Sequence, residues 1–139
     1  VYTVDNNDGM RKTDDYVNKD FNGLCFVNLV DFDMTYGHRN DIDGYANALS
    51  EFDLWLKDFL PKLKKSDMLI ITADHGCDPG DKSTDHTREY VPLLIYGNIV
   101  KGGSYGTRES FADIGKTVCD FLEISYNGEG KSLMPIILK

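Results

Sequence analysis

The chain contains three histidines, and each of them stands close behind an aspartate. The three pairs are Asp33 with His38, Asp74 with His75, and Asp85 with His86. Aspartate carboxylates and neutral imidazoles form the mixed oxygen and nitrogen ligand set of catalytic zinc, manganese and iron sites. The pattern therefore indicates a metal centre rather than three unrelated core or surface histidines.

These candidate ligands differ in how strongly the sequence supports them. Asp33 and His38 flank a glycine turn that could aim both at one point, although Asp33 could also simply cap that turn. Asp74 and His75 are adjacent, and adjacent side chains on a strand point to opposite faces, so they can converge only where a strand ends. His86 stands in a polar loop, where an exposed histidine without a ligand role is the alternative.

Five candidate ligands are too many for one catalytic ion with an open position. They fit two ions about 3.5–4 Å apart, as in two-metal phosphoryl-transfer sites. One ion would take Asp33, His38 and His86. The other would take Asp74 and His75, and it would lack both a further protein ligand and a nucleophile. The sequence therefore predicts that part of the site lies outside this chain.

Length and charge describe one acidic globular domain. The chain has 139 residues, enough for one sizeable core, and its net charge is −8 from 15 basic and 23 acidic residues. Neither nucleic acid nor an anionic membrane is expected as a partner of such a surface. The apolar runs are far too short to cross a bilayer, and no signal peptide is recognisable, so we expect a cytoplasmic protein.

The three cysteines agree with a reducing compartment. Their number is odd and no CxxC motif occurs, which favours free thiols. Cys25 and Cys119 lie in apolar segments and are expected to be buried. Cys77 follows the second Asp-His pair, and we interpret it as a neighbour of the metal site rather than a ligand.

Short apolar runs alternate with helical periods, which is typical of an α/β fold. The expected strands are residues 24–30, 68–73 and 91–96, and the expected helices are residues 9–20, 42–63 and 111–122. Asp33 follows the first strand and Asp74 the second. Both would thus lie at carboxyl ends of strands, where open α/β sheets place their ligand sites.

The longest helix is predicted from apolar residues at steps of three and four. These residues are Ile42, Tyr45, Leu49, Phe52, Leu56, Phe59 and Leu63, with Trp55 beside them. Asn40 or Asp41 can cap its start, and Pro61 should end or kink it. Ser110 is the expected cap of the last helix. We interpret the apolar stripe as a core face and assign it no chemistry.

Three stretches resemble the metal motifs of phosphopentomutases. Residues 28–41 (NLVDFDMTYGHRND) resemble the second metal motif, residues 70–79 (IITADHGCDP) the DHG motif, and residues 84–94 (TDHTREYVPLL) the stretch with the last histidine ligand. Residues 6–10 and 108–115 also look familial. The resemblance covers nearly the whole chain.

The resemblance implies a place in the alkaline-phosphatase-like metalloenzymes. Their core is a doubly wound α/β fold with a mostly parallel sheet flanked by helices, split in sequence by an inserted cap domain. Residues 1–139 would be the carboxy-terminal part of that metal-binding core. The amino-terminal core segment and the cap would be absent, and with them the first metal aspartate and the threonine nucleophile. The chain by itself is therefore expected to be inactive.

The implied reaction interconverts ribose or deoxyribose 1-phosphate and 5-phosphate through a phosphothreonine enzyme. Two Mn²⁺ ions would polarise the phosphoryl oxygens, with Zn²⁺, Mg²⁺ or Co²⁺ as chemical alternatives. Arg39 and Arg88 stand beside ligands and could bind phosphate, although salt bridges to nearby carboxylates are an equal alternative. The implied partners are a pentose phosphate and the remainder of the full-length chain.

Two other functions stay open at this level. Another enzyme of the same superfamily, such as cofactor-independent phosphoglycerate mutase or a phosphohydrolase, would share the metal site. A noncatalytic metal-binding module would explain why no nucleophile is present.

Overall fold

The computed structural model describes all residues 1–139 and divides the chain into two compact units. The first unit holds residues 1–20, 25–63 and 71–94, and the second holds residues 21–24, 64–70 and 95–139. No helix is both long and apolar enough to cross a membrane.

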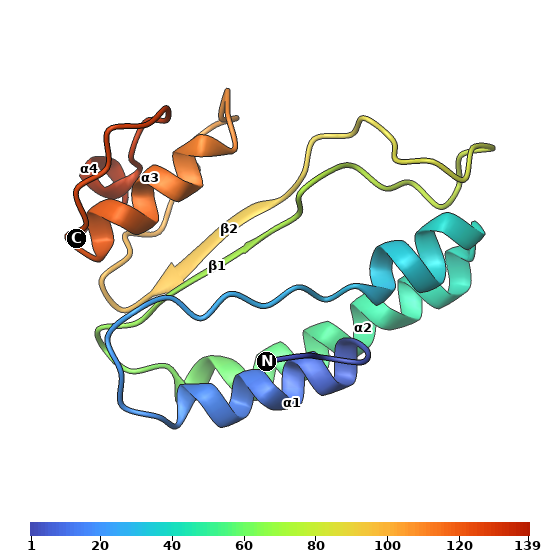
Figure 1. Ribbon diagram of the computed structural model, residues 1–139, viewed down its shortest axis with the longest axis horizontal. Helices are drawn as coiled ribbons and strands as arrows, with labels where there is room; N and C mark the ends of the chain where they lie inside the picture. The colour runs from blue at the N-terminus through green and yellow to red at the C-terminus, as the bar shows by residue number, and fades with distance from the viewer. The chain divides into compact units, whose positions relative to one another are not determined.

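Two helices that lie side by side form the body of the first unit (Figure 1). Helix α1 (Asn6–Val17) begins where Asp5 accepts a hydrogen bond from the Asp8 N–H, which is an ordinary N-cap. Helix α2 (Ile42–Phe59) is held against α1 through Asp14, whose carboxylate accepts from Trp55 Nε1 at 3.0 Å. The helix predicted at residues 9–20 thus exists, but it starts and ends three residues earlier.

Helix α2 starts as predicted, but it ends earlier than predicted, at Phe59, and it buries a partly different face. Asp41, one of the two expected caps, accepts a hydrogen bond from the Gly44 N–H at 2.9 Å. The helix passes into a 3₁₀ turn, η3 (Leu60–Lys62), that contains Pro61. Ile42 and Leu49 are exposed, contrary to the predicted stripe. The inward face instead includes Ala48 and Trp55, whose ring stacks on Phe59 with centroids 4.6 Å apart.

The sheet consists of two hydrogen-bonded strands, β1 (Met68–Thr72) and β2 (Leu93–Gly97). Gly97 at the end of β2 lies against Asp67 and Met68 at the start of β1, so the strands run in opposite directions. The α/β class is confirmed. The parallel pairing expected of the wider sheet is not formed by these two strands, because residues 73–92 between them fold back as an antiparallel ribbon and do not cross over the sheet.

The antiparallel pairing continues beyond the strands toward the predicted ligands. An isolated antiparallel bridge joins Gly76 to Thr87, and the Thr87 N–H donates to the Gly76 carbonyl at 3.2 Å. The chain therefore runs out along one side of a ribbon and returns along the other. His75 and His86 each precede one member of this bridge and therefore flank it on opposite sides, close enough for their rings to meet.

The predicted strand at residues 24–30 is wrong as a paired strand. Val27 and Leu29 pack toward Gly9 of α1, which gives one covered face, but Phe26 is 84% exposed. Residues 25–29 run as an extended segment without backbone hydrogen bonds to a neighbour (Figure 1). A strand is assigned by its hydrogen-bonded partner as well as by its residues, and this segment has no such partner.

Two short turns lead from this segment to α2. Residues Phe32–Tyr36 form a π-helical turn, η1, and Gly37–Arg39 form a 3₁₀ turn, η2. The ring of Phe32 packs against Tyr45 of α2, with centroids 5.4 Å apart. Single π-helical turns occur often at functional sites, and this one holds a candidate ligand.

The second unit has its core between two helices and the end of the chain. Helices α3 (Ala112–Phe121) and α4 (Met134–Ile137) enclose Leu133 and Ile137, which are almost fully buried. Residues 100 and 138 form an antiparallel bridge. Helix α4 was not predicted, because four residues are too few for a periodic pattern.

A buried polar network ties α3 to the segment before α4. Asp113 accepts hydrogen bonds from Arg108 at 2.8 Å and from the Lys131 N–H at 2.7 Å. The Lys131 N–H and the Arg108 guanidinium hold the pKa of Asp113 below its ordinary value. Thr117, with no exposed surface, donates to the Asp113 carbonyl and accepts from the Leu133 N–H at 2.9 Å.

Two smaller expectations also need correction. Cys25 is exposed rather than buried, because it belongs to the extended segment that no strand covers. Ser110 does not occupy the N-cap position of α3, which Phe111 takes without a side-chain cap. The Ser110 hydroxyl nevertheless accepts from the Ala112 N–H at 3.1 Å. Cys119 is half-buried and free.

Replacing Thr117 by valine should destabilise the second unit. The substitution keeps the shape of the side chain but leaves the buried Leu133 N–H without an acceptor, which costs about 1–3 kcal/mol. Urea unfolding of the variant should show this loss, and Thr107→Val, at an exposed threonine with no hydrogen bond, should not. Equal stability of the two variants would contradict the role given to Thr117.

Candidate metal centre

The carboxylate of Asp33 lies among all three histidines of the chain. Its Oδ2 is 3.3 Å from Nε2 of His38, and its Oδ1 is 3.5 Å from Nε2 of His86 and 4.0 Å from Nε2 of His75. Turns η1 and η2 bring His38 back to Asp33, and the ribbon end brings the other two. Three segments distant in sequence thus converge on one side chain within the first unit.

Backbone carbonyls fix the orientation of two of the imidazole rings. Nδ1 of His38 bonds to the Thr84 carbonyl, and Nδ1 of His75 bonds to the Gly76 carbonyl at 3.0 Å. A carbonyl oxygen only accepts, so each Nδ1 carries the proton. Both rings therefore turn Nε2 toward Asp33. Metal-binding histidines commonly show this pattern, in which the second ring nitrogen donates to a carbonyl.

The donor atoms are arranged as a cation requires. Asp33 Oδ1 is buried and has no hydrogen-bond partner. Ligand atoms of Asp33, His75 and His86 all lie within 4.8 Å of one another. A carboxylate oxygen that faces imidazole lone pairs is electrostatically unfavourable until a positive charge lies between them. The residues present therefore fit a divalent metal ion bound by mixed oxygen and nitrogen ligands.

The other predicted ligand, Asp74, lies at the margin of this group. Its side chain is 83% exposed, and its nearest candidate partner is Nε2 of His75 at 3.6 Å. The rings of His75 and His86 stack with centroids 3.6 Å apart, so residues predicted for different ions touch each other. The structure brings four of the five predicted ligands together and leaves the carboxylate of Asp74 turned toward solvent.

Cys77 lies beside the site as a thiol. Burial, followed by the negative charges of Asp33, Glu89 and Asp78, raises its pKa above the ordinary value. A raised pKa disfavours the thiolate, the form that binds metal. A Cβ on Gly37 would overlap Cys77 Sγ, so the absence of a side chain there lets η2 approach the ribbon. Burial likewise raises the pKa of Tyr45.

The two predicted phosphate-binding arginines are both exposed and neither forms a salt bridge. Arg39 makes only a 3.5 Å contact from its guanidinium to the His38 carbonyl. Arg88 makes no hydrogen bond or ion pair. Their side chains are free to meet an anion, and their role in substrate binding stays a prediction.

Residues that orient the ligands were missed in the sequence. Thr84 orients His38 through its backbone carbonyl. Every residue has such a carbonyl, so the residue type gives no signal for this role. Thr87 accepts from the Asp78 N–H at 2.8 Å and donates to Glu89, which closes the base of the loop. Asn40, expected only as a helix cap, holds the same loop through its side chain. The available sequence signal for Asn40 was its position, because it is a polar residue directly after a ligand motif.

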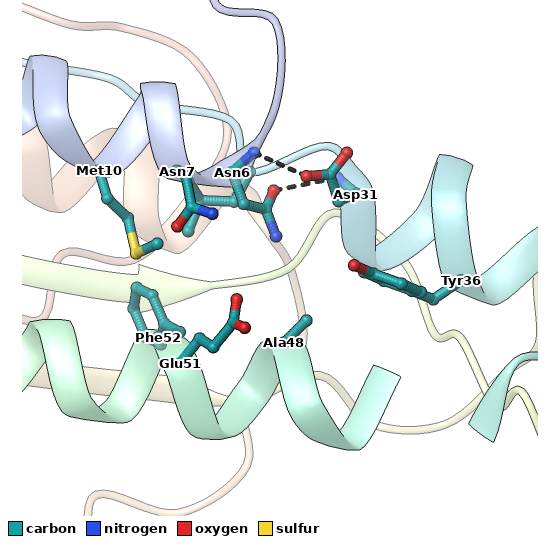
Figure 2. A pocket seen from close by; sticks show the side chains of 9 residues that line it. Asn6, Asn7, Met10, Asp31, Tyr36, Ala48, Glu51 and Phe52 are labelled. Atoms are coloured by element: carbon teal, nitrogen blue, oxygen red, sulfur yellow. Dashed lines mark hydrogen bonds between the residues drawn. The ribbon is translucent and has the colours of Figure 1, made fainter. Parts of the chain in front are cut away.

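A small cavity is lined by residues of α1, α2 and the segment around η1, and no histidine is among them (Figure 2). It has a volume of about 30 Å³, room for one or two water molecules. Two hydrogen bonds link Asn6 and Asp31 at its edge, from the Asn6 N–H at 2.7 Å and from the Asp31 N–H at 3.0 Å (Figure 2). Asp31 thus fixes the start of η1 to α1, while Asp33, two residues on, faces the histidines.

A family model described as the Metalloenzyme superfamily matches residues 1–126. The match covers most of the chain and includes every residue of the metal centre. The chain therefore belongs to the Metalloenzyme superfamily, whose members use divalent metal ions.

Curated relatives at high identity are named phosphopentomutase. The protein from Lachnoclostridium phytofermentans is 54% identical across 100% of this chain, and that from Acetivibrio thermocellus is 57% identical across 99%. The protein from Carboxydothermus hydrogenoformans is 57% identical across 84% of the chain. The chain spans 36% of the length of the first two relatives and 30% of the third.

Replacing Gly76 by alanine should open the ribbon end. The new Cβ would lie 2.6 Å from the Thr87 carbonyl oxygen and 2.7 Å from the Glu89 nitrogen, and backbone atoms cannot yield without moving the loop. Overpacking of this kind costs about 1–3 kcal/mol and should separate His75 from His86. Thermal unfolding and Mn²⁺ titration measure both effects. Gly102→Ala, where nothing lies within 4 Å, is the matched control and should change neither.

Proposed function

We propose that this chain carries most of the metal centre of a phosphopentomutase, an isomerase that interconverts ribose or deoxyribose 1-phosphate and 5-phosphate. The observation that carries the proposal is the buried, unpartnered Oδ1 of Asp33 among three imidazole nitrogens. The relatives named phosphopentomutase support the choice of a pentose phosphate as the substrate. A phosphorylated threonine elsewhere in the whole protein would be the nucleophile.

The proposed cofactor is a pair of Mn²⁺ ions, with Zn²⁺, Mg²⁺ and Co²⁺ as alternatives that the ligands also accept. Asp33, His38 and His86 would hold one ion. The distances support this grouping, because Asp33 lies 3.3 Å from His38 and 3.5 Å from His86 but 4.0 Å from His75. His75 and Asp74 would hold the other ion together with a ligand from the rest of the protein.

When bound, the ions supply positive charge that stabilises phosphoryl oxygens during transfer. The chain's own residues hold and orient that charge. The carbonyls of Thr84 and Gly76 fix the imidazole rings, and Asp33 presents a carboxylate oxygen to each side. Arg39 and Arg88, both exposed and without salt bridges, would contact substrate phosphate.

The remaining parts of the proposal concern the whole protein. Residues 1–139 would form the carboxy-terminal part of the catalytic core, with an amino-terminal core segment and a cap domain completing it. The three free cysteines favour a location in the cytoplasm, where thiols stay reduced.

In the whole protein, Asp33→Asn should strongly weaken binding of the ion assigned to Asp33, His38 and His86, because it removes a negative charge that faces three ligand nitrogens. Loss of an outer partner of a metal ligand already costs about 10–100-fold in affinity, so we expect a decrease of more than about 100-fold in Mn²⁺ affinity. In the whole protein, Asp74→Asn should remove the other of the two ions measured by calorimetric titration. Asp85→Asn, at an exposed carboxylate outside the cluster, is the control and should bind as wild type. Normal Mn²⁺ binding by Asp33→Asn would contradict the assigned centre.

The whole natural protein that contains this chain should convert ribose 1-phosphate to ribose 5-phosphate when supplied with Mn²⁺, and a chelator should stop the reaction. Product formation can be followed by phosphorus NMR. Interconversion of phosphoglycerates instead would support the related mutase. Release of inorganic phosphate alone would support a phosphohydrolase. Metal binding with no reaction on any of these substrates would favour a noncatalytic module.

A further inference from the structure

Asn40 stands at the junction between the first ligand segment and helix α2. It ends turn η2 in the left-handed conformation, with φ 52° and ψ 34°, and its N–H donates to the Gly37 carbonyl at 3.0 Å. Asparagine is among the few residues other than glycine that adopt this conformation readily. His38 lies two residues before it in the same turn, so a shift of the Asn40 backbone would also move this predicted ligand.

The side chain of Asn40 reaches across to the loop that carries His86. Its Nδ2 donates to the Asp81 carbonyl at 2.5 Å and to the Ser83 carbonyl at 3.3 Å. Two carbonyl oxygens can only accept, so the amide nitrogen must face them and the orientation of the amide is fixed. Its Oδ1 is buried without a partner.

This amide holds the loop at the place where the loop meets the ligands. Ser83 is followed by Thr84, whose carbonyl orients His38, and His86 comes two residues later. We propose that Asn40 is a positioning residue of the metal centre: its side-chain amide fixes residues 81–86 so that His38 and His86 present Nε2 to Asp33. This inference depends on the proposed metal-binding function and adds a residue to it.

Few other hydrogen bonds join this part of the loop to the first ligand segment. Residues 80–86 include no buried side chain, and the side chain of His86 is 51% exposed. The Gly76–Thr87 bridge and the bonds of Asp78 hold the base of the loop, and the bonds of the Asp81 and Ser83 side chains stay within it. The bond between His38 and the Thr84 carbonyl is the other link to the first ligand segment. Without the amide, the loop would be hydrogen-bonded to this segment only through His38, and metal binding would have to overcome the added conformational entropy of His86.

Two variants separate the amide from the backbone conformation. Asn40→Gly keeps the left-handed turn and removes the side chain, and Asn40→Asp keeps the shape but places a carboxylate against two carbonyls. In the whole protein, both should bind Co²⁺ about 10-fold more weakly than wild type, and the visible absorption of the bound ion should change as His86 is displaced. The control is Asn18→Asp at the end of α1, because Nδ2 of Asn18 also donates to a backbone carbonyl, that of Asp14.

A double-mutant cycle tests whether Asn40 acts through His86. If it does, Asn40→Asp should cost clearly less Co²⁺ affinity in a His86→Ala background than in wild type. Equal costs in the two backgrounds, or unchanged affinity and spectrum in both Asn40 variants, would overturn the inference and leave the proposed function intact. Failure of the wild-type protein to bind Co²⁺ would overturn both.

Discussion

The site depends on one electrostatic constraint, which is a buried carboxylate oxygen of Asp33 that no hydrogen-bond donor satisfies. Burial of such a group is costly unless a charge or a donor compensates it. Here the neighbours are imidazoles whose other nitrogens are already committed to carbonyls in two of the three cases. The surrounding geometry can therefore be understood as a scaffold that keeps several lone pairs close together until a cation balances them.

The scaffold is made of backbone more than of side chains. A π-helical turn and a 3₁₀ turn place Asp33 and His38, and an antiparallel ribbon places His75 and His86. The side chains themselves are only partly buried, and His86 is half exposed. Packing contributes little to their positions, so hydrogen bonds to carbonyls and close backbone approach at Gly76 must fix them.

Much of this site could be predicted because its chemistry depends on residue type. Carboxylates and imidazoles placed after apolar runs indicated a metal centre, and the structure brings Asp33 together with all three histidines. The orienting groups could not be predicted, because a carbonyl such as that of Thr84 is present in every residue. The fold shows the same division. Helix α2 follows from local periodicity and capping, whereas the strand at residues 24–30 needs a neighbour that the local sequence does not specify.

The extended segment at residues 25–29 has a consequence for the chemistry a few residues away. Its backbone groups offer an open row of donors and acceptors, and the segment leads directly into η1, which carries Asp33. A strand that pairs with this edge would restrict the same backbone that a bound ion restricts. By thermodynamic reciprocity, whatever factor such pairing adds to the affinity for the ion, the ion adds to the affinity of the two strands for each other. Assembly of the sheet and binding of the metal would then be thermodynamically linked, so that each favours the other.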